Sequence, residues 1–258
     1  MKVVILAGGL GSRISEESQA RPKPMIEIGG KPMLWHIMKM YARHGFNEFI
    51  ICAGYKGQAI KEYFINFYLY NSDITVELGS NRVEVHASDT ESFKVTIVDT
   101  GLETNTAGRI QRIQKYVGGE RFMLTYGDGV SDVNLAGLLD FHQKHGHLAT
   151  LTSVQMPGRF GNLDMAPDGR VEHFQEKPDG DGAWINGGFF VLEPGIFKYL
   201  AGDMDDVQWE KKPLLEIAND NQLVAFKHTG FWKCMDTLRD KNDLESLWAS
   251  GRAAWKTW

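Results

Sequence analysis

Three features are scarce or missing in this sequence, and each narrows the class of protein. Among 258 residues there are two cysteines, Cys52 and Cys234, without a CxxC pair, which argues against a disulfide framework or a structural zinc site. No stretch approaches the roughly 18 apolar residues that a membrane-spanning helix needs. The N-terminus reads directly into a strand, without the apolar core and cleavage site of a signal peptide. We therefore expect a soluble protein of a reducing compartment, the cytoplasm, with no membrane partner.

Basic residues are also fewer than acidic residues. Lysine and arginine together number 28 against 33 acidic residues, giving a net charge of −5, and there is no block of like charges. A nucleic-acid binder usually carries a basic patch, so we expect no nucleic-acid partner. The hydrophobic share of 43% is ample for a folded core, and the length fits one large α/β domain.

The first informative stretch of the sequence lies at its N-terminus. Residues 2–6 form an apolar, β-branched run, typical of a strand buried on both faces. The following turn, residues 7–13, holds three glycines, which let backbone N–H groups approach a phosphate closely. It ends in Arg13, whose guanidinium donates in a planar fork, and ten residues later Lys23 stands between two prolines. This stretch predicts a site for the triphosphate of a nucleotide.

The alternative for the same stretch is an ordinary strand-to-helix turn, which often carries glycines. The stretch matches neither of two common phosphate-binding patterns. No Gly-Lys-Ser/Thr follows it, and its glycine spacing differs from G-x-G-x-x-G. The remaining motifs of the chain therefore have to decide between the two interpretations.

Up to about residue 155 the chain alternates between strand and helix patterns. Apolar runs predict four further strands, and apolar residues at helical spacing predict four helices. The strands are expected at 48–53, 94–99, 121–126 and 147–154, and the helices at 33–44, 58–70, 104–117 and 132–145, the last with Asp132 as a candidate N-cap. Such alternation favours parallel strands with right-handed crossovers. Residues 71–94 interrupt it and indicate an insertion or a small edge hairpin.

Beyond about residue 157 the pattern changes to short strands separated by glycine and proline turns. Strands are expected at 161–165, 170–174, 184–186, 188–192 and 223–230, a junction at 231–236, and helices at 194–200, 212–219 and 237–250. The predicted fold is α/β, a doubly wound and mostly parallel, Rossmann-like sheet with an antiparallel portion in the C-terminal half.

Two aspartates are candidate metal ligands. Ligands in such sheets lie beyond the carboxyl ends of the strands, and Asp128 follows the strand expected at 121–126. Glycines flank it, so its carboxylate stands clear and suits Mg²⁺, which prefers hard oxygen ligands; a plain turn aspartate is the alternative. Asp236 ends another extended run and offers either a second carboxylate or an N-cap for the last helix.

Two segments of the C-terminal half suit a sugar. Glu176 and Lys177 place a carboxylate and an ammonium group side by side, and Asn186 precedes two glycines. A carboxylate, an amide and open backbone N–H groups together fit a polyhydroxylated ligand, although each alone is more often part of a turn.

In their order along the chain, these segments resemble the signature of the sugar-1-phosphate nucleotidylyltransferases. The resemblance covers nearly the whole chain and rests on residues 6–13, 21–24, 126–128, 176–178, 186–188 and the region of Asp236. Longer stretches are similar to the family members that transfer a cytidylyl group, namely 22–32, 34–38, 125–132, 157–161, 174–178, 184–191 and 235–242.

The resemblance implies one nucleotidylyltransferase domain, residues 1–258, with a nucleotide-binding core at 1–155 and a sugar-binding portion with the C-terminal helix at 156–258. It also implies CTP and α-D-glucose 1-phosphate as substrates, Mg²⁺ as cofactor, a homo-oligomer, and a product used for lipopolysaccharide O-antigen. The aromatic residues of 63–70 and the tryptophans of the C-terminus could form the interface, or could fill the core of the monomer.

Carried over residue by residue, the resemblance implies a role for each motif. Lys23, Arg13 and Asp128 are the expected catalytic residues, with Lys23 acting on the transition state, and Asp128 and Asp236 are the expected metal ligands. Nucleotide contacts are expected from Leu6, Ala7, Gly8, Gly9, Gly11, Ser12, Arg13, Lys23, Thr104 and Arg109. Sugar-phosphate contacts are expected from Gly161, Glu176, Lys177, Asn186 and Gly187.

The chain departs from the family pattern at three positions. Asn105 and Ala107 stand where an apolar residue and a second glycine are expected, in the segment 104–109 that would read the base, and Cys234 stands in place of a proline. A uridylyl-, thymidylyl- or guanylyltransferase therefore stays open. So does a homologue that only senses nucleotide or sugar, although such a sensor has little need for two metal-binding carboxylates.

Overall fold

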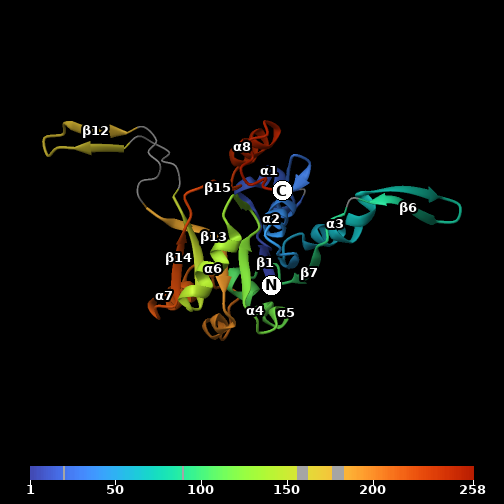
Figure 1. Ribbon diagram of the computed structural model, residues 1–258, viewed down its shortest axis with the longest axis horizontal. Coiled ribbons are helices and arrows are strands. Elements are labelled where there is room, and N and C mark those ends of the chain that lie inside the picture. Colours follow the sequence, from blue (N-terminus) through green and yellow to red (C-terminus); the bar gives the residue numbers. More distant parts are fainter. Residues whose placement is uncertain (20, 89, 156–161, 176–182) are drawn as a thin grey trace.

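The computed structural model describes residues 1–258 except 20, 89, 156–161 and 176–182. Its centre is a seven-stranded sheet (Figure 1). The strand order is β14 (Leu223–Lys227), β10 (Ala149–Val154), β13 (Ile185–Leu192), β8 (Phe122–Tyr126), β1 (Lys2–Ala7), β4 (Glu48–Ala53) and β7 (Lys94–Asp99). β13 runs antiparallel to both of its neighbours, whereas the other pairings in this sheet are parallel. The predicted α/β fold with a mostly parallel sheet is confirmed.

Side chains of β1 alternate between two cores, because successive residues of a strand point to opposite faces of the sheet. Val3 and Ile5 pack into one core, and Val4 and Leu6 into the other. Helices cover both faces, which makes the sheet doubly wound (Figure 1). The first core takes residues from α2 (Met33–Ala42), α3 (Gly57–Tyr70), α6 (Leu135–His145) and α8 (Leu238–Ala249), and the second from α4 (Thr106–Arg112), α5 (Gln114–Val117), the 3-10 helix η3 (Pro194–Leu200) and α7 (Lys212–Asn219).

Short elements connect or extend this body. They are the helical turns η1 (Ser12–Ile14), α1 (Ser15–Ser18) and η2 (Lys23–Met25), and the strand pairs β2 (Glu27–Ile28) with β3 (Lys31–Pro32), β5 (Ser72–Glu77) with β6 (Arg82–Ser88), β9 (Gly129–Ser131) with β15 (Trp232–Cys234), and β11 (Asn162–Met165) with β12 (Val171–Gln175). The interruption expected at 71–94 is thus a hairpin that pairs with itself, and it projects beyond α3 (Figure 1). No helix in the described part of the chain is long and apolar enough to cross a bilayer.

Three local predictions are wrong. α6 begins after Asn134, whose side chain accepts a hydrogen bond from the backbone N–H of Gly137 at 3.0 Å, so Asp132 is not its N-cap. Asp132 instead lies 3.0 Å from Nε2 of His228. The two strands expected at 184–186 and 188–192 are one strand, β13, and the expected junction at 231–236 contains β15.

The sequence left open whether the aromatic residues of 63–70 and the C-terminal tryptophans fill the core or form an interface. The structure places these two groups differently. Trp255 is fully buried and stacks on Trp248, so the C-terminal tryptophans pack into the core of the monomer. At the end of α3, by contrast, Ile65 and Tyr70 are each 76% exposed. Trp248 and Trp258 are only partly buried, so the C-terminus and the surface of α3 both remain candidate interfaces.

Candidate functional site

The glycine turn and Asp128 lie at the same edge of the sheet because β1 and β8 are adjacent parallel strands. A cavity of about 340 Å³ opens there, beyond the carboxyl ends of the strands, as expected for this fold. All ten residues predicted to contact the nucleotide line it: Leu6, Ala7, Gly8, Gly9, Gly11, Ser12, Arg13, Lys23, Thr104 and Arg109. Asp128 and Asp236 line it as well.

Gly8 needs to be glycine because of what lies behind it. A Cβ atom at this position would fall 2.1 Å from Nη1 of Arg109, whereas a Cβ atom at Gly9 would meet nothing within 4 Å. The carbonyl oxygen of Gly8 accepts hydrogen bonds from Nη2 of Arg109 at 3.0 Å and from the backbone N–H of Tyr55 at 3.2 Å. The turn is therefore held from beneath and keeps Gly9 toward open space.

Arg109 supports the turn from inside the protein. It is 4% exposed, and its Nη1 donates to Oγ1 of Thr100 at 2.7 Å and to the carbonyl oxygen of Gly101 at 2.8 Å. These bonds, with the one to Gly8, tie the ends of β1 and β7 together. Although Arg109 lines the cavity, its terminal nitrogens already donate to the protein, and its contact with a base stays a prediction.

Lys23 lies between two carboxylates at the centre of the site. Its Nζ is 2.6 Å from Oδ2 of Asp128 and 2.7 Å from Oδ1 of Asp236. Nη1 of Arg13 lies 2.9 Å from the other oxygen of Asp236. The two expected metal-binding carboxylates thus meet at one ammonium group, and Arg13 joins them through Asp236, although the four residues come from distant parts of the chain.

The pairing of β9 with β15 brings the two aspartates together. Gly129 is opposite Cys234 in this pair, and the backbone N–H of Met235 donates to the carbonyl oxygen of Asp128 at 2.8 Å. Thr237 is the N-cap of α8, with its side chain accepting from the N–H of Asp240. The N-cap role left open for Asp236 is therefore filled by its neighbour, and the Asp236 carboxylate faces the site.

The charges of the cluster stabilise one another. Burial acts to lower the pKa of Lys23, but the charges and hydrogen bonds of Asp128 and Asp236 raise it above its usual value. Burial likewise acts to raise the pKa of Asp236, but Lys23 and Arg13 lower it below its usual value. Both groups are therefore charged at neutral pH.

A second cavity, of about 210 Å³, adjoins the first on the side of β13. The two cavities share Arg13, Tyr126, Asp128 and Asp236. Gly187, one of the residues predicted to contact the sugar, lines the second cavity. The Asn186 amide donates to the hydroxyl oxygen of Tyr126 at 3.2 Å. Three other predicted sugar contacts, Gly161, Glu176 and Lys177, lie outside the described residues.

Comparison with known proteins identifies this arrangement. Residues 2–241 match the sequence model of the family described as "Nucleotidyl transferase". The chain belongs to this family. It is 56% identical to the glucose-1-phosphate cytidylyltransferase of Salmonella typhimurium and 43% identical to the probable glucose-1-phosphate cytidylyltransferase of Bacillus subtilis, in each case over 100% of both chains.

Solved structures agree on the fold of this nucleotidyl transferase. A putative glucose-1-phosphate thymidylyltransferase from Bacillus anthracis, in complex with a sucrose, superposes with a TM-score of 0.71 over 96% of this chain and 94% of that chain. Its sequence identity is 16%, so the likeness concerns the fold and not the choice of nucleotide.

The chemistry of the aspartate pair fits a magnesium ion. Asp128 and Asp236 have side chains 29% and 30% exposed, so both can be reached from the cavity. In the described residues, no group of three or more His, Cys, Asp or Glu side chains is arranged to hold a metal ion. Two carboxylates with water and substrate phosphates completing the shell is the usual environment of Mg²⁺, which gives up its water reluctantly.

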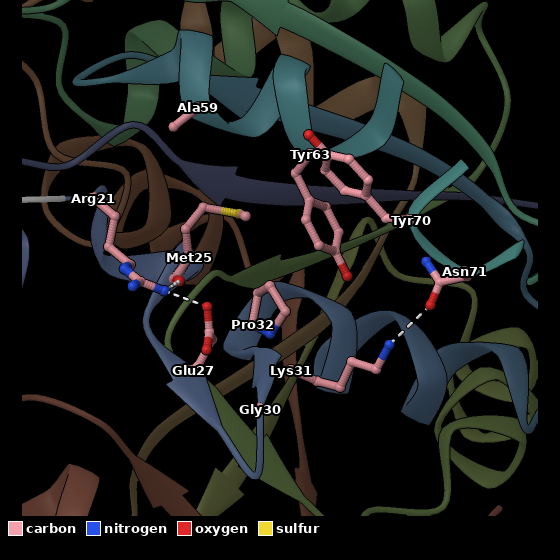
Figure 2. A pocket seen from close by; sticks show the side chains of 10 residues that line it. All are labelled: Arg21, Met25, Glu27, Gly30, Lys31, Pro32, Ala59, Tyr63, Tyr70 and Asn71. Carbon is pink, nitrogen blue, oxygen red and sulfur yellow. Dashed lines mark hydrogen bonds and ion pairs between the residues drawn. The ribbon is translucent and has the colours of Figure 1, made fainter. Parts of the chain in front are cut away.

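A third cavity, of about 280 Å³, lies outside this site, between α3 and the segment that carries Lys23 (Figure 2). In this cavity Arg21 faces Glu27, with which it forms an ion pair, and Nη1 of Arg21 also donates to the carbonyl oxygen of Met25 at 3.4 Å. Nζ of Lys31 donates to Oδ1 of Asn71 at 3.0 Å. The contacts of Arg21 brace the turn η2, on which Lys23 stands.

Glu210 lies next to the site, and no feature of the sequence pointed to it. It belongs to the loop between η3 and α7 and accepts a hydrogen bond from the hydroxyl of Tyr126 at 2.7 Å. No motif surrounds it, and its partners lie far away in the sequence. Tyr126 had a detectable signal, since it ends the strand before Asp128.

Proposed function

We propose that the protein transfers the cytidylyl group of CTP to α-D-glucose 1-phosphate, giving CDP-glucose and pyrophosphate. The observation that carries this is the 56% identity, over the full length of both chains, to the Salmonella typhimurium glucose-1-phosphate cytidylyltransferase. The site supports it, because the glycine turn, two cationic side chains and two carboxylates converge on one cavity. Phosphoryl chemistry needs such positioning and electrostatic stabilisation.

In the reaction, an oxygen of the glucose 1-phosphate attacks the α-phosphorus of CTP, and the bond from that phosphorus to the bridging oxygen of the β-phosphate breaks. Pyrophosphate leaves with the bonding electrons. The nucleophile is already an anion, so no general base is required. The protein has to hold two polyanions in line and to stabilise the charge that develops on phosphorus.

Lys23 and Arg13 are the residues whose charges suit this task. Lys23 is 14% exposed on its side chain, so its charge acts at a site partly shielded from water, where electrostatic interactions are stronger. Arg13 is 76% exposed on its side chain and stands at the mouth of the cavity, where it can bind incoming phosphates. Lys177 is expected to align the phosphate of the sugar.

We further propose that Asp128 and Asp236 hold Mg²⁺ when substrates bind. The ion would neutralise phosphate charge and stabilise the leaving pyrophosphate. The test is turnover after treatment with EDTA, followed by addition of Mg²⁺ or Ca²⁺. Recovery with Mg²⁺ supports the assignment, and full activity in EDTA contradicts it.

The choice of nucleotide is the sharpest test of the proposed function. Pyrophosphate release should be measured with CTP, UTP, dTTP and GTP, each with glucose 1-phosphate. We expect CTP to give the highest kcat/KM. A preference for another nucleotide would assign the chain to a different branch of the family, and tight binding without turnover of any nucleotide would make it a sensor.

We also propose that the protein is a homo-oligomer that uses the surface of α3 and the β5–β6 hairpin. This surface exposes large apolar side chains: Ile65, Tyr68, Leu69, Tyr70, Ile74, Val76, Leu78 and Val83. Large apolar side chains exposed in such number on one helix and one hairpin are typical of an interaction site. Light scattering of Tyr70→Glu/Leu78→Glu should show a smaller particle than wild type. Leu215→Glu, at a site 60% exposed on α7, is the matched control, and unchanged mass in the double variant would refute the proposal.

A cytoplasmic location and a role in surface polysaccharide synthesis stay predictions.

A further inference from the structure

Tyr126 stands between the two cavities. It is the last residue of β8 and lines both the nucleotide-side cavity and the cavity next to β13. Its hydroxyl donates to Oε1 of Glu210 at 2.7 Å and accepts from Nδ2 of Asn186 at 3.2 Å. A single side chain thus connects Asn186, which is predicted to contact the sugar but is not among the described residues that line either cavity, with the carboxylate of Glu210.

The other oxygen of Glu210 points to the nucleotide side. Oγ1 of Thr106 donates to Oε2 of Glu210 at 3.0 Å, and the same hydroxyl accepts from the backbone N–H of Trp209 at 2.7 Å. Thr106 is the first residue of α4 and lines the nucleotide-side cavity. One carboxylate therefore binds two hydroxyl groups, one associated with each cavity.

The direction of every bond in this network is fixed. The backbone N–H of Gly188 donates to Oδ1 of Asn186 at 2.9 Å, which orients the amide with its NH₂ toward Tyr126. Tyr126 then has to donate its proton to Glu210. Because hydroxyl and amide groups of this kind lose stabilisation when a partner is removed, a change at one member alters the position of the next.

The loop that carries Glu210 is rigidly attached to the nucleotide side. Trp209 is fully buried in the core and packs edge-on against Phe190. The backbone N–H of Asn105 donates to the carbonyl oxygen of Asp205 at 2.6 Å, and that of Ala107 donates to Val207 at 3.1 Å. Residues 205–210 and the segment expected to read the base therefore form one connected unit.

We propose that Glu210 is a positioning residue that couples the two substrate sites. Its hydrogen bond with Thr106 connects it to the nucleotide-side cavity. Its hydrogen bond with Tyr126 positions the Asn186 amide, which is predicted to contact the sugar. Binding of one substrate therefore orders the residues that bind the other. Glu210 is absent from the described residues that line either cavity, and it acts without touching substrate. The inference rests on the proposed function for the identity of the two substrates.

The test compares KM for each substrate in Tyr126→Phe, Glu210→Gln and Thr106→Val. We expect each variant to raise KM for glucose 1-phosphate about tenfold, a usual size for coupling between sites, with a smaller change in kcat. The decisive variant is Thr106→Val, since its hydroxyl lies on the nucleotide side. Thr106→Ser retains the hydroxyl and should restore wild-type KM values.

The double variant Thr106→Val/Tyr126→Phe should be no worse than the more affected single variant, because both break the same network. Tyr199→Phe is the matched control: it removes a tyrosine hydroxyl that donates to Asp220 at 2.6 Å, outside the lining of both cavities. It should leave both KM values unchanged.

Two results would overturn the proposal. One is that Thr106→Val raises KM for CTP alone while the effects of the two substitutions multiply in the double variant. The other is that all variants lower the melting temperature while both KM values stay at wild type. If wild type prefers another nucleotide, the proposed function fails in that detail, but the same comparison made with that nucleotide still tests the coupling.

Discussion

The ammonium nitrogen of Lys23 lies 2.6 Å from Oδ2 of Asp128, although 105 residues separate the two in the sequence. Asp236 holds the same nitrogen from the other side at 2.7 Å. The lysine is thereby held, before any substrate arrives, at the point where the two carboxylates converge.

Replacing Lys23 with alanine should lower kcat by roughly 10²-fold, the size expected for loss of one stabilising charge. The fold should persist, because Lys23 contributes no side chain to either core cluster. Steady-state kinetics together with circular dichroism check this. Lys31→Ala, which removes an ammonium group of the third cavity, should leave kcat near wild type. Turnover of Lys23→Ala within about threefold of wild type would disprove the assignment.

Gly8 and Gly9 should differ sharply in their tolerance of a methyl group. Gly8→Ala places Cβ 2.1 Å from the buried guanidinium of Arg109, whereas Gly9→Ala meets nothing within 4 Å. Overpacking of this kind costs about 1–3 kcal/mol, so the melting temperature of Gly8→Ala should fall by several degrees. That of Gly9→Ala should stay at wild type. Equal melting temperatures would show that Arg109 does not hold the turn.

Stability should fall below about pH 6.5 in part because of His36. Burial lowers the pKa of His36 from its usual value of 6.5, and its ring accepts from Nε1 of Trp255 at 3.4 Å while Nε2 lies 2.8 Å from the carbonyl oxygen of Ile28. The unfolded chain therefore binds the proton first as pH falls, and the free energy of unfolding decreases from about pH 6.5 down to the folded pKa.

Urea unfolding between pH 8 and pH 5 measures this effect. The slope from one such proton is at most about 1.4 kcal/mol per pH unit. His36→Gln, which keeps a donor and an acceptor, should show a shallower decline below pH 6.5 than wild type. Some decline should remain, because burial also lowers the pKa of His142 and His145. An identical slope in wild type and variant would contradict the role of His36.

Both thiols should react slowly in the folded protein. Burial, with the nearby Asp236 and Asp128 carboxylates, raises the pKa of Cys234 to about 11, and burial raises that of Cys52 to about 12. The thiolate is the reactive form, so Ellman's reagent at pH 7.5 should label native protein roughly 10²-fold more slowly than protein unfolded in guanidinium. Labelling of either thiol in the native protein as fast as in the unfolded protein would contradict this expectation.

The sequence predicted those parts of the structure that local pattern determines. The buried strand before the glycine turn and the helix at 33–44 follow from their apolar spacing, and the convergence of the turn with Asp128 follows from adjacent parallel strands. Asp236 is predicted from its place at the end of an extended run and from the family resemblance. That it faces Lys23 depends on Thr237, the better-placed N-cap of α8.

What the sequence could not predict depends on partners from elsewhere in the chain. Asp132 and Asn134 are equally good N-caps, and the choice between them follows from His228, which lies beside Asp132. The direction of the Arg109 side chain is set by carbonyl groups of two other loops. Glu210 carries no local signal because both of its hydroxyl donors come from more than 80 residues away.

The ion pair of Lys23 with Asp236 also has a consequence for the synthesis of the protein. Lys23 is synthesised 213 residues before Asp236. A growing chain on the ribosome can therefore expose the nucleotide-side turn long before the second carboxylate emerges. Fragments that end before β15 would lack Asp236, one of the two carboxylates that hold Lys23. Incomplete translation products should therefore be inert instead of partly active.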